Sequence, residues 1–209
     1  MSDSRSIEIL QATPDQAELA AELLHATGPP IFDYLYGSEP AFRTRMMALQ
    51  WQAEEGFLSH RHAMAAYGPG GDMLGLELGF DNTVEDAAFE AASAIVQAHA
   101  TAAQTAQIFA AARNLVYLTP FTPVGNYCVH NLAVTNTDRG TGLGRRLLEG
   151  AFERAAKSGY KSVCLDVMEI NPAVGFYRHL GMRLACETRI PDLVEHHGFP
   201  TIYRMVRDV

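Results

Sequence analysis

The sequence contains few cysteines, no long apolar run and no excess of positive charge. Its three cysteines, Cys128, Cys164 and Cys186, are an odd number without paired spacing, and each lies in an apolar stretch. They predict reduced core residues and not a disulfide framework. No stretch approaches the length of a membrane span, and the start of the chain lacks the apolar segment of a secretory signal. We therefore expect a cytoplasmic protein that binds no membrane.

Charge and size restrict the classes of protein further. The formal net charge of −8 argues against nucleic-acid binding as the main task and is compatible with a cationic or amine substrate. No histidine pair has further ligand residues at the spacing that a metal site requires, so no metal is expected. With 209 residues and 48% hydrophobic content, the chain suits one domain, which we expect over residues 1–209.

The first half of the chain shows strand and helix patterns followed by a helical segment. Strands are predicted at 7–10, 62–67 and 73–80 and helices at 14–26 and 40–55, with a loop or short turn at 31–37. The glycines between residues 68 and 72 predict a hairpin. Residues 83–115 contain no Gly or Pro and begin with Thr83-x-x-Asp86, which resembles a capping box. We predict a helical insertion over 83–118, as one helix or as two that separate near 99–101.

The second half contains a strand, a helix and a second strand within a short distance. Tyr127 to Val134 is an apolar strand pattern, and apolar residues recur at helical spacing from Leu143 until Gly159. Residues 162–167 form the continuous apolar run of a buried parallel strand. A helix is predicted from Asn171, as N-cap, to Gly181, and strands at 183–188 and 202–206 complete a mixed sheet.

The segment between the strand and the helix of this unit has the composition of an anion site. Gly140, Gly142 and Gly144 remove side chains where backbone N–H groups fan out at a helix N-terminus. Arg145 and Arg146 in the first helical turn are unfavourable against the helix dipole unless an anionic ligand sits there. The pattern predicts a phosphate-bearing small molecule.

Two familiar phosphate motifs fit poorly. A P-loop requires a lysine and a hydroxyl residue after the glycines, and neither is present. A dinucleotide-binding turn requires three glycines at fixed spacing directly after the strand, and here the third is missing. Asp166 lies where a ribose-binding acid is expected, so an NAD-binding oxidoreductase stays open as an alternative.

A third interpretation accounts both for the glycine segment and for the residues that follow the second strand. Leu132-Ala133-Val134 followed by Arg139-x-x-Gly142-x-Gly144 resembles the glycine-loop signature of the GNAT superfamily of N-acetyltransferases. Residues 171–181, from Asn-Pro-Ala through Tyr177 to Gly181, resemble the second motif of that superfamily, with Met182 in place of the usual Phe. Residues 127–182 would then form the acyl-CoA-binding core.

The resemblance implies a fold and a cofactor site. The fold is of the α/β (α+β) class: a mixed, mostly antiparallel sheet with a central parallel strand pair splayed in a V, flanked by helices, here with a helical insertion before the glycine-loop strand. Acetyl-CoA would be the cosubstrate, with its pyrophosphate on the loop and its pantetheine arm along the open strand. The implied cofactor-binding residues are Leu132, Ala133, Val134, Arg139, Gly140, Thr141, Gly142, Leu143, Gly144, Arg145, Asn171 and Phe176.

For the catalytic residues, the resemblance implies an acid but no clear base. Tyr177 occupies the position of the superfamily's usual acid, which protonates the leaving thiolate, although it also fits as a core tyrosine. No glutamate lies between Gly125 and Thr137, so His130 is the candidate base, acting through water, or else a packed histidine. It shares strand parity with Leu132, which predicts a common face. Asp33, Tyr34 and Tyr36 form an acidic and aromatic cluster that would suit a cationic acceptor.

These observations predict an N-acetyltransferase that moves an acetyl group from acetyl-CoA to a primary amine by direct attack. The acceptor, a small molecule or a peptide, is left open. A CoA-binding regulatory module without turnover is the second hypothesis. Neither a metal nor nucleic acid is expected as a partner. The oligomeric state is open, with a homodimer as the commonest case.

Overall fold

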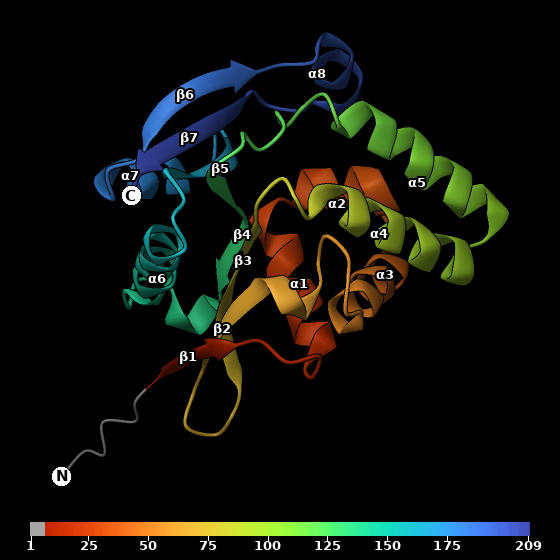
Figure 1. The fold of residues 1–209 in the computed structure, drawn as a ribbon. Helices are drawn as coiled ribbons and strands as arrows, with labels where there is room; N and C mark the ends of the chain where they lie inside the picture. Colours follow the sequence, from red (N-terminus) through yellow and green to blue (C-terminus); the bar gives the residue numbers. More distant parts are fainter. Residues whose placement is uncertain (1–6) are drawn as a thin grey trace.

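A seven-stranded sheet, in the order β1-β2-β3-β4-β5-β7-β6, runs through the computed structural model, which describes residues 7–209 (Figure 1). Only β4 and β5 are parallel neighbours; the other adjacent strands are antiparallel. The strands are β1 (Glu8–Gln11), β2 (Ala63–Tyr67), β3 (Met73–Phe80), β4 (Asn126–Val134), β5 (Ser162–Met168), β6 (Arg183–Thr188) and β7 (Ile202–Asp208). This architecture confirms the predicted fold class.

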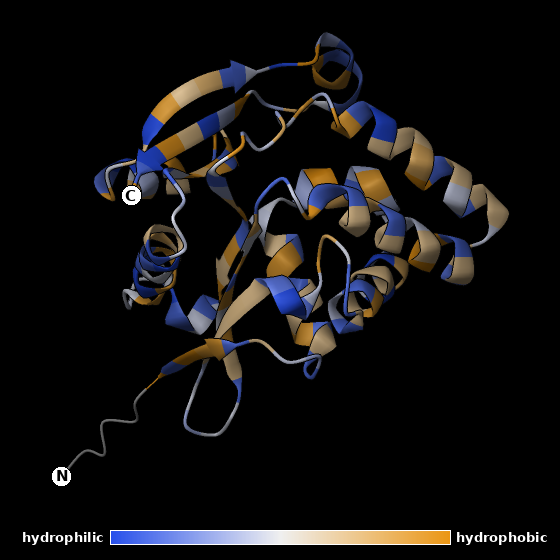
Figure 2. Cartoon of the chain, viewed as in Figure 1, coloured by the Kyte–Doolittle hydropathy of each residue, from blue (hydrophilic) through white to orange (hydrophobic). Residues whose placement is uncertain are grey.

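Helices cover both faces of the sheet. The helices are α1 (Ala17–Thr27), α2 (Pro29–Tyr36), α3 (Pro40–Gln52), α4 (Glu85–His99), α5 (Ala102–Leu115), α6 (Leu143–Lys157), α7 (Ala173–His179) and α8 (Pro191–His197). One core lies between the sheet and α6 and α7, and a second lies between the sheet and α1 to α3. The insertion forms an outer layer, because α4 packs on α3 and α5 packs on α2 (Figure 1). In Figure 2 the central strands are mostly coloured as apolar, as expected for strands covered on both faces.

The V between the parallel strands is visible in the pairing register. Residues Asn126–Val129 of β4 pair with Ser162–Leu165 of β5. Beyond Val129, β4 pairs with β3 alone, while β5 continues beside β7. The register of β4 against β3 also shifts at this point, because Gly79 faces Val129 and Leu78 faces Asn131. His130 is therefore the extra residue of a β-bulge, which bends β4 away from β5.

Several sequence-based expectations need correction. Residues 31–37 were expected to be a loop or turn, but residues 31–36 belong to α2, because Pro29 and Pro30 occupy the first helical positions, where proline starts a helix. Thr83 does not cap a helix: its backbone N–H and hydroxyl both donate to Asp81 Oδ1. The capping box lies instead at Thr101, at the start of α5.

Three smaller points concern the cysteines, the C-terminal part and the chain start. Cys128 and Cys164 are buried register partners at the base of the V, but Cys186, on strand β6, is exposed and not a core residue. Helix α8 lies in a stretch for which no helix was predicted. The expected single domain includes residues 1–6, which lie outside the described part of the chain. No helix within residues 7–209 is long and apolar enough to cross a membrane.

Candidate active site

The glycine loop ends in an α-helix N-terminus with unused N–H groups. Gly140 and Gly142 have φ of +79° and +88°, and nothing lies within 4 Å of the Cβ that either lacks. Glycine is therefore required here by backbone conformation and not by crowding. The Arg146 N–H donates to the Gly142 carbonyl. Among the described residues, the three N–H groups before it, those of Leu143 to Arg145, donate to no backbone carbonyl.

Short side chains brace this loop from within. The carboxylate of Asp138 accepts hydrogen bonds from the hydroxyls of Thr135 (2.5 Å) and Thr137 (3.1 Å). The Thr141 hydroxyl donates to the Asp138 carbonyl at 2.7 Å. The hydroxyl of this predicted cofactor-binding residue is therefore bonded within the loop. The sequence analysis missed Asp138, although the neighbouring threonines were a visible signal of Asx-type hydrogen bonding.

Exposed arginines surround the loop. The Arg145 Nε bonds to Glu149 at 2.8 Å one turn along α6, and Arg146 donates to the Ile7 carbonyl at 3.0 Å. Arg139 is exposed. The free N–H groups, the absence of Cβ atoms and this positive charge together fit a pyrophosphate.

The open half of β4 leads from the bulge to this loop. Residues 130–134 lack a β5 partner, so one backbone edge of Leu132, Ala133 and Val134 faces the gap between the strands. The side chains of Leu132 and Val134 pack against a cluster that includes Leu143 and Leu147 of α6. The backbone edge is thus held next to the glycine loop, where an extended ligand can pair with it as a strand does.

Tyr177 lies on α7, on the same face of the sheet as α6. Its side chain is 9% exposed and packs in the core cluster that includes Val129 of β4 and Val167 of β5. Burial raises the pKa of Tyr177 to about 12. Within residues 7–209 its hydroxyl has no hydrogen-bond partner, so the phenol is both protonated at neutral pH and free to donate. Asn171, just before α7, accepts a hydrogen bond from the Ala173 N–H at 2.9 Å, as an N-cap does.

His130 does not share a face with Leu132, and the parity prediction was wrong because the bulge reverses the alternation. Its ring stacks on Phe80, with centroids 4.0 Å apart and planes at 26°. Phe80 covers one face of the imidazole, although the residue as a whole is exposed. Desolvation, together with the charges of Arg204 and His62, lowers the pKa of His130 below the ordinary 6.5. A neutral, weakly basic ring favours the packed-histidine alternative.

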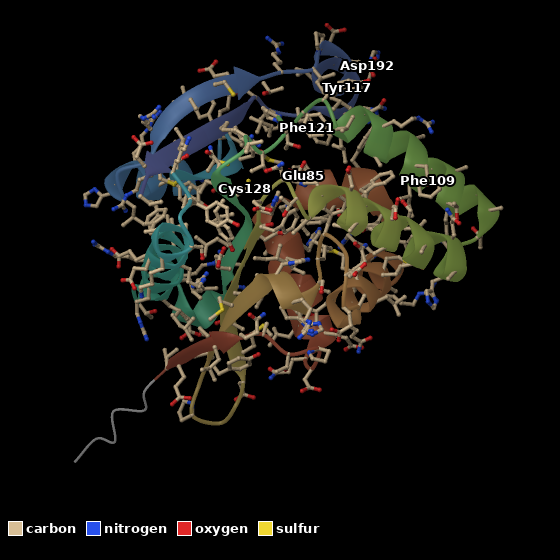
Figure 3. The ribbon with its side chains drawn as sticks, in the orientation of Figure 1. Glu85, Phe109, Tyr117, Phe121, Cys128 and Asp192 are labelled. Atoms are coloured by element: carbon tan, nitrogen blue, oxygen red, sulfur yellow. The ribbon has the colours of Figure 1, made fainter. Side chains whose placement is uncertain are left out.

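Asp166 is not available to bind a ribose. The Arg204 guanidinium bonds to both of its carboxylate oxygens, at 2.8 and 2.5 Å. The third arm of Arg204 donates to the Phe121 carbonyl at 2.8 Å, on the segment that leads from α5 into β4, the strand of Cys128 (Figure 3). Asp166 was the residue that kept an NAD-binding oxidoreductase open as an alternative, and this pairing with Arg204 removes that support.

The acidic and aromatic cluster on α2 is divided. Asp33 and Tyr34 line a cavity between α2 and α5. Tyr36 points into the core, where its hydroxyl accepts a hydrogen bond from Gln50 at 2.5 Å, so the structure does not bring it to the other two. Among the described residues there is no group of three or more metal-ligating side chains.

The class of protein follows from a comparison with known domains. Residues 93–183 match the family model described as an acetyltransferase (GNAT) domain. This stretch contains the glycine loop, the V and α7, and the match confirms the resemblance to the GNAT superfamily. No curated protein matched the chain.

Solved structures show the same fold over nearly the whole chain. One is an acetyltransferase with 19% identity, covering 97% of this chain and 99% of the other at a TM-score of 0.72. An N-acetyltransferase from Staphylococcus aureus Mu50 has 13% identity, with 96% and 100% covered and a TM-score of 0.73. A Bacillus subtilis acetyltransferase in complex with CoA has 13% identity, with 98% and 99% covered and a TM-score of 0.58. At these identities the likeness concerns the fold.

Proposed function

We propose that this protein is a cytoplasmic N-acetyltransferase that transfers an acetyl group from acetyl-CoA to a primary amine by direct attack. The observation that carries the proposal is the braced glycine loop, whose unused N–H groups lie beside the unpaired edge of β4. A structural neighbour, the acetyltransferase from Bacillus subtilis, was solved in complex with CoA. When bound, acetyl-CoA supplies a thioester that an amine can attack.

Binding of the cosubstrate is assigned to backbone more than to side chains. The N–H groups at the start of α6 would hold the pyrophosphate, with Arg139 and Arg145 near it. The edge of Leu132 to Val134 would hold the pantetheine arm. Asn171 and Phe176 would contact the same arm from the α7 side.

Tyr177 is the proposed acid. Because its pKa is raised to about 12, it keeps its proton at neutral pH and can donate it to the thiolate that leaves. An alkylammonium with a pKa near 10.4 is neutral in only about one molecule in 2,500 at pH 7, so the acceptor also needs help to lose a proton. We assign that step to water held near His130.

The experiment compares Tyr177→Phe with the wild-type protein. Transfer would be measured as CoA thiol release with an aliphatic diamine, an arylethylamine, an amino acid, an aminoglycoside and a lysine-containing peptide. Loss of the acid should reduce kcat by about a hundredfold or more, with CoA affinity unchanged. Tyr160→Phe is the matched control, because it removes a phenol whose hydroxyl is already engaged, as a donor to Asp81 at 2.8 Å.

Two results would contradict the proposal. An unchanged kcat in Tyr177→Phe would remove the acid assignment. CoA binding without transfer to any of these amines would favour the regulatory module instead. For the base, an unchanged pH dependence of kcat/KM in His130→Ala would leave His130 as a packing residue.

A further inference from the structure

A second site lies outside the acyl-transfer gap. A cavity of about 580 Å³ opens between α2, α5 and the segment that follows α8. In Figure 1 the C-terminal end of α5 lies next to α8, and the cavity sits where these elements meet α2. None of its lining residues belongs to β4, β5 or α7. The helical insertion supplies one complete wall, which makes the cavity a feature of this chain and not of the acyl-CoA-binding core.

The side chains of α5 that line the cavity explain why this space is not filled. Gln107, Ala110 and Asn114 lie on one face of the helix, since residues three and four apart are neighbours. The two amides stand at the ends, and the small alanine lies between them. The Asn114 Nδ2 donates to the Tyr34 hydroxyl at 2.8 Å, which ties α5 to α2. Tyr34 also meets Phe199 edge to face, with centroids 5.4 Å apart, so the aromatic part of the wall is fixed.

Asp33 is the acidic side chain of the cavity lining, which also includes His197. Asp33 is 44% exposed, and its Oδ1 contacts Arg43 Nη1 at 2.7 Å and His25 Nε2 at 3.0 Å. Within residues 7–209 no hydrogen bond reaches its other oxygen, Oδ2. No lysine or arginine lines the cavity, and Arg43 lies behind the carboxylate, only 12% exposed. A carboxylate oxygen with unused acceptor capacity, beside aromatic rings, suits an ammonium group and disfavours an anion.

We propose that this cavity binds an organic primary ammonium group. Its N–H donors bond to Asp33 Oδ2 and to the amide oxygens of Gln107 and Asn114, and its carbon skeleton lies against Ala110 and Phe199. The group has two sources: a second amino group of the acceptor, which rests on the proposed function, or a separate amine that is not acetylated.

The binding test uses the full chain without acetyl-CoA, so that it does not depend on turnover. Calorimetric titration with 2-phenylethylamine is compared with 2-phenylethanol, which has the same skeleton and no charge. The amine should bind about tenfold more tightly than the alcohol, and Asp33→Asn should remove that preference. Ala110→Leu, at an exposed position, should obstruct the part of the wall between the two amides and weaken binding of both.

A matched control separates the carboxylate from its ion pair. Arg43→Gln breaks the same pair but keeps Asp33, so affinity for the amine should be kept or increased. Equal affinity for amine and alcohol in the wild-type protein would overturn the proposal. So would equal losses in Asp33→Asn and Arg43→Gln, or unchanged binding in Ala110→Leu.

Kinetics then identify the source. An increase in KM for diamines but not for monoamines in Ala110→Leu assigns the cavity to the acceptor's second amino group. Unchanged KM values with weakened binding assign it to a separate amine. Binding as predicted without any acetyl transfer would leave the ammonium site standing and the proposed function refuted.

Discussion

The glycine loop and the α2–α5 cavity are the two regions for which we propose ligands, and they are built in opposite ways. The loop occupies consecutive residues from Thr135 to Arg145 and offers backbone N–H groups. The cavity is assembled from α2, α5 and the segment after α8, and it offers side chains. The loop should therefore tolerate changes of side chain but not of backbone conformation. The cavity should show the reverse sensitivity.

The largest expected effect concerns the support beneath the loop. Helix α6 carries the loop at its start, and its Arg154 pairs with Glu77 of β3, which is fully buried. Arg154→Leu would remove the cationic partner of that carboxylate and leave only the Tyr127 hydroxyl bonded to it, and we expect a loss of about 3–5 kcal/mol in the free energy of unfolding. Denaturant unfolding measures it.

A control on the same helix sharpens this prediction. Lys157 pairs with Glu153 at 3.8 Å, and both side chains are exposed. Lys157→Leu should change stability little, because exposed pairs contribute little. Equal losses in the two variants would mean that the buried pair does not anchor α6.

The same carboxylate predicts a pH dependence. Burial raises the pKa of Glu77 to about 7, against the lowering effects of Arg154 and Tyr127. The folded state then holds a proton that the unfolded state has released, so this group's contribution to stability is present below pH 4.5 and is lost as pH rises to about 7. Glu77→Gln should lack this component in a comparison of unfolding free energies across that range. Parallel pH curves for the two proteins would contradict it.

A pair of glycines at the two ends of α6 separates binding from stability. Gly142 and Gly159 have φ of +88° and +82°, and both have open space around the missing Cβ. Alanine at either position should cost about 1 kcal/mol, which lowers the melting temperature by about 2–4 °C. Only Gly142→Ala should also weaken CoA binding. An equal CoA affinity in both variants would show that the loop conformation does not matter for the ligand.

The smallest effect is expected in the insertion. Thr101 caps α5 through a reciprocal capping box with Gln104. Thr101→Ala should cost about 1 kcal/mol, whereas Thr101→Ser keeps the hydroxyl and should cost less. CoA affinity should stay unchanged in both, because α5 belongs to the cavity and not to the loop. A change in CoA affinity would mean that the two regions are coupled.

Features that are local in sequence could be predicted, and those that depend on distant residues could not. The glycine loop, α6 and the parallel strands follow from spacing within short stretches, and the structure contains them. The bulge at His130 depends on how β4 meets β3, so strand parity placed His130 wrongly. Arg204 is remote in sequence from Asp166, which it engages. Tyr36 is separated from Asp33 by its burial against Gln50 of α3, a partner that the pattern of residues 31–37 does not indicate.

The central claim is that the glycine loop holds the pyrophosphate of CoA. The most direct measurement is a calorimetric titration of the wild-type protein with CoA, with pantetheine, which lacks the nucleotide and pyrophosphate, and with NADH. The account predicts saturable binding of CoA, much weaker binding of pantetheine and none of NADH. Equal affinity for CoA and pantetheine, or binding of NADH in place of CoA, would contradict it.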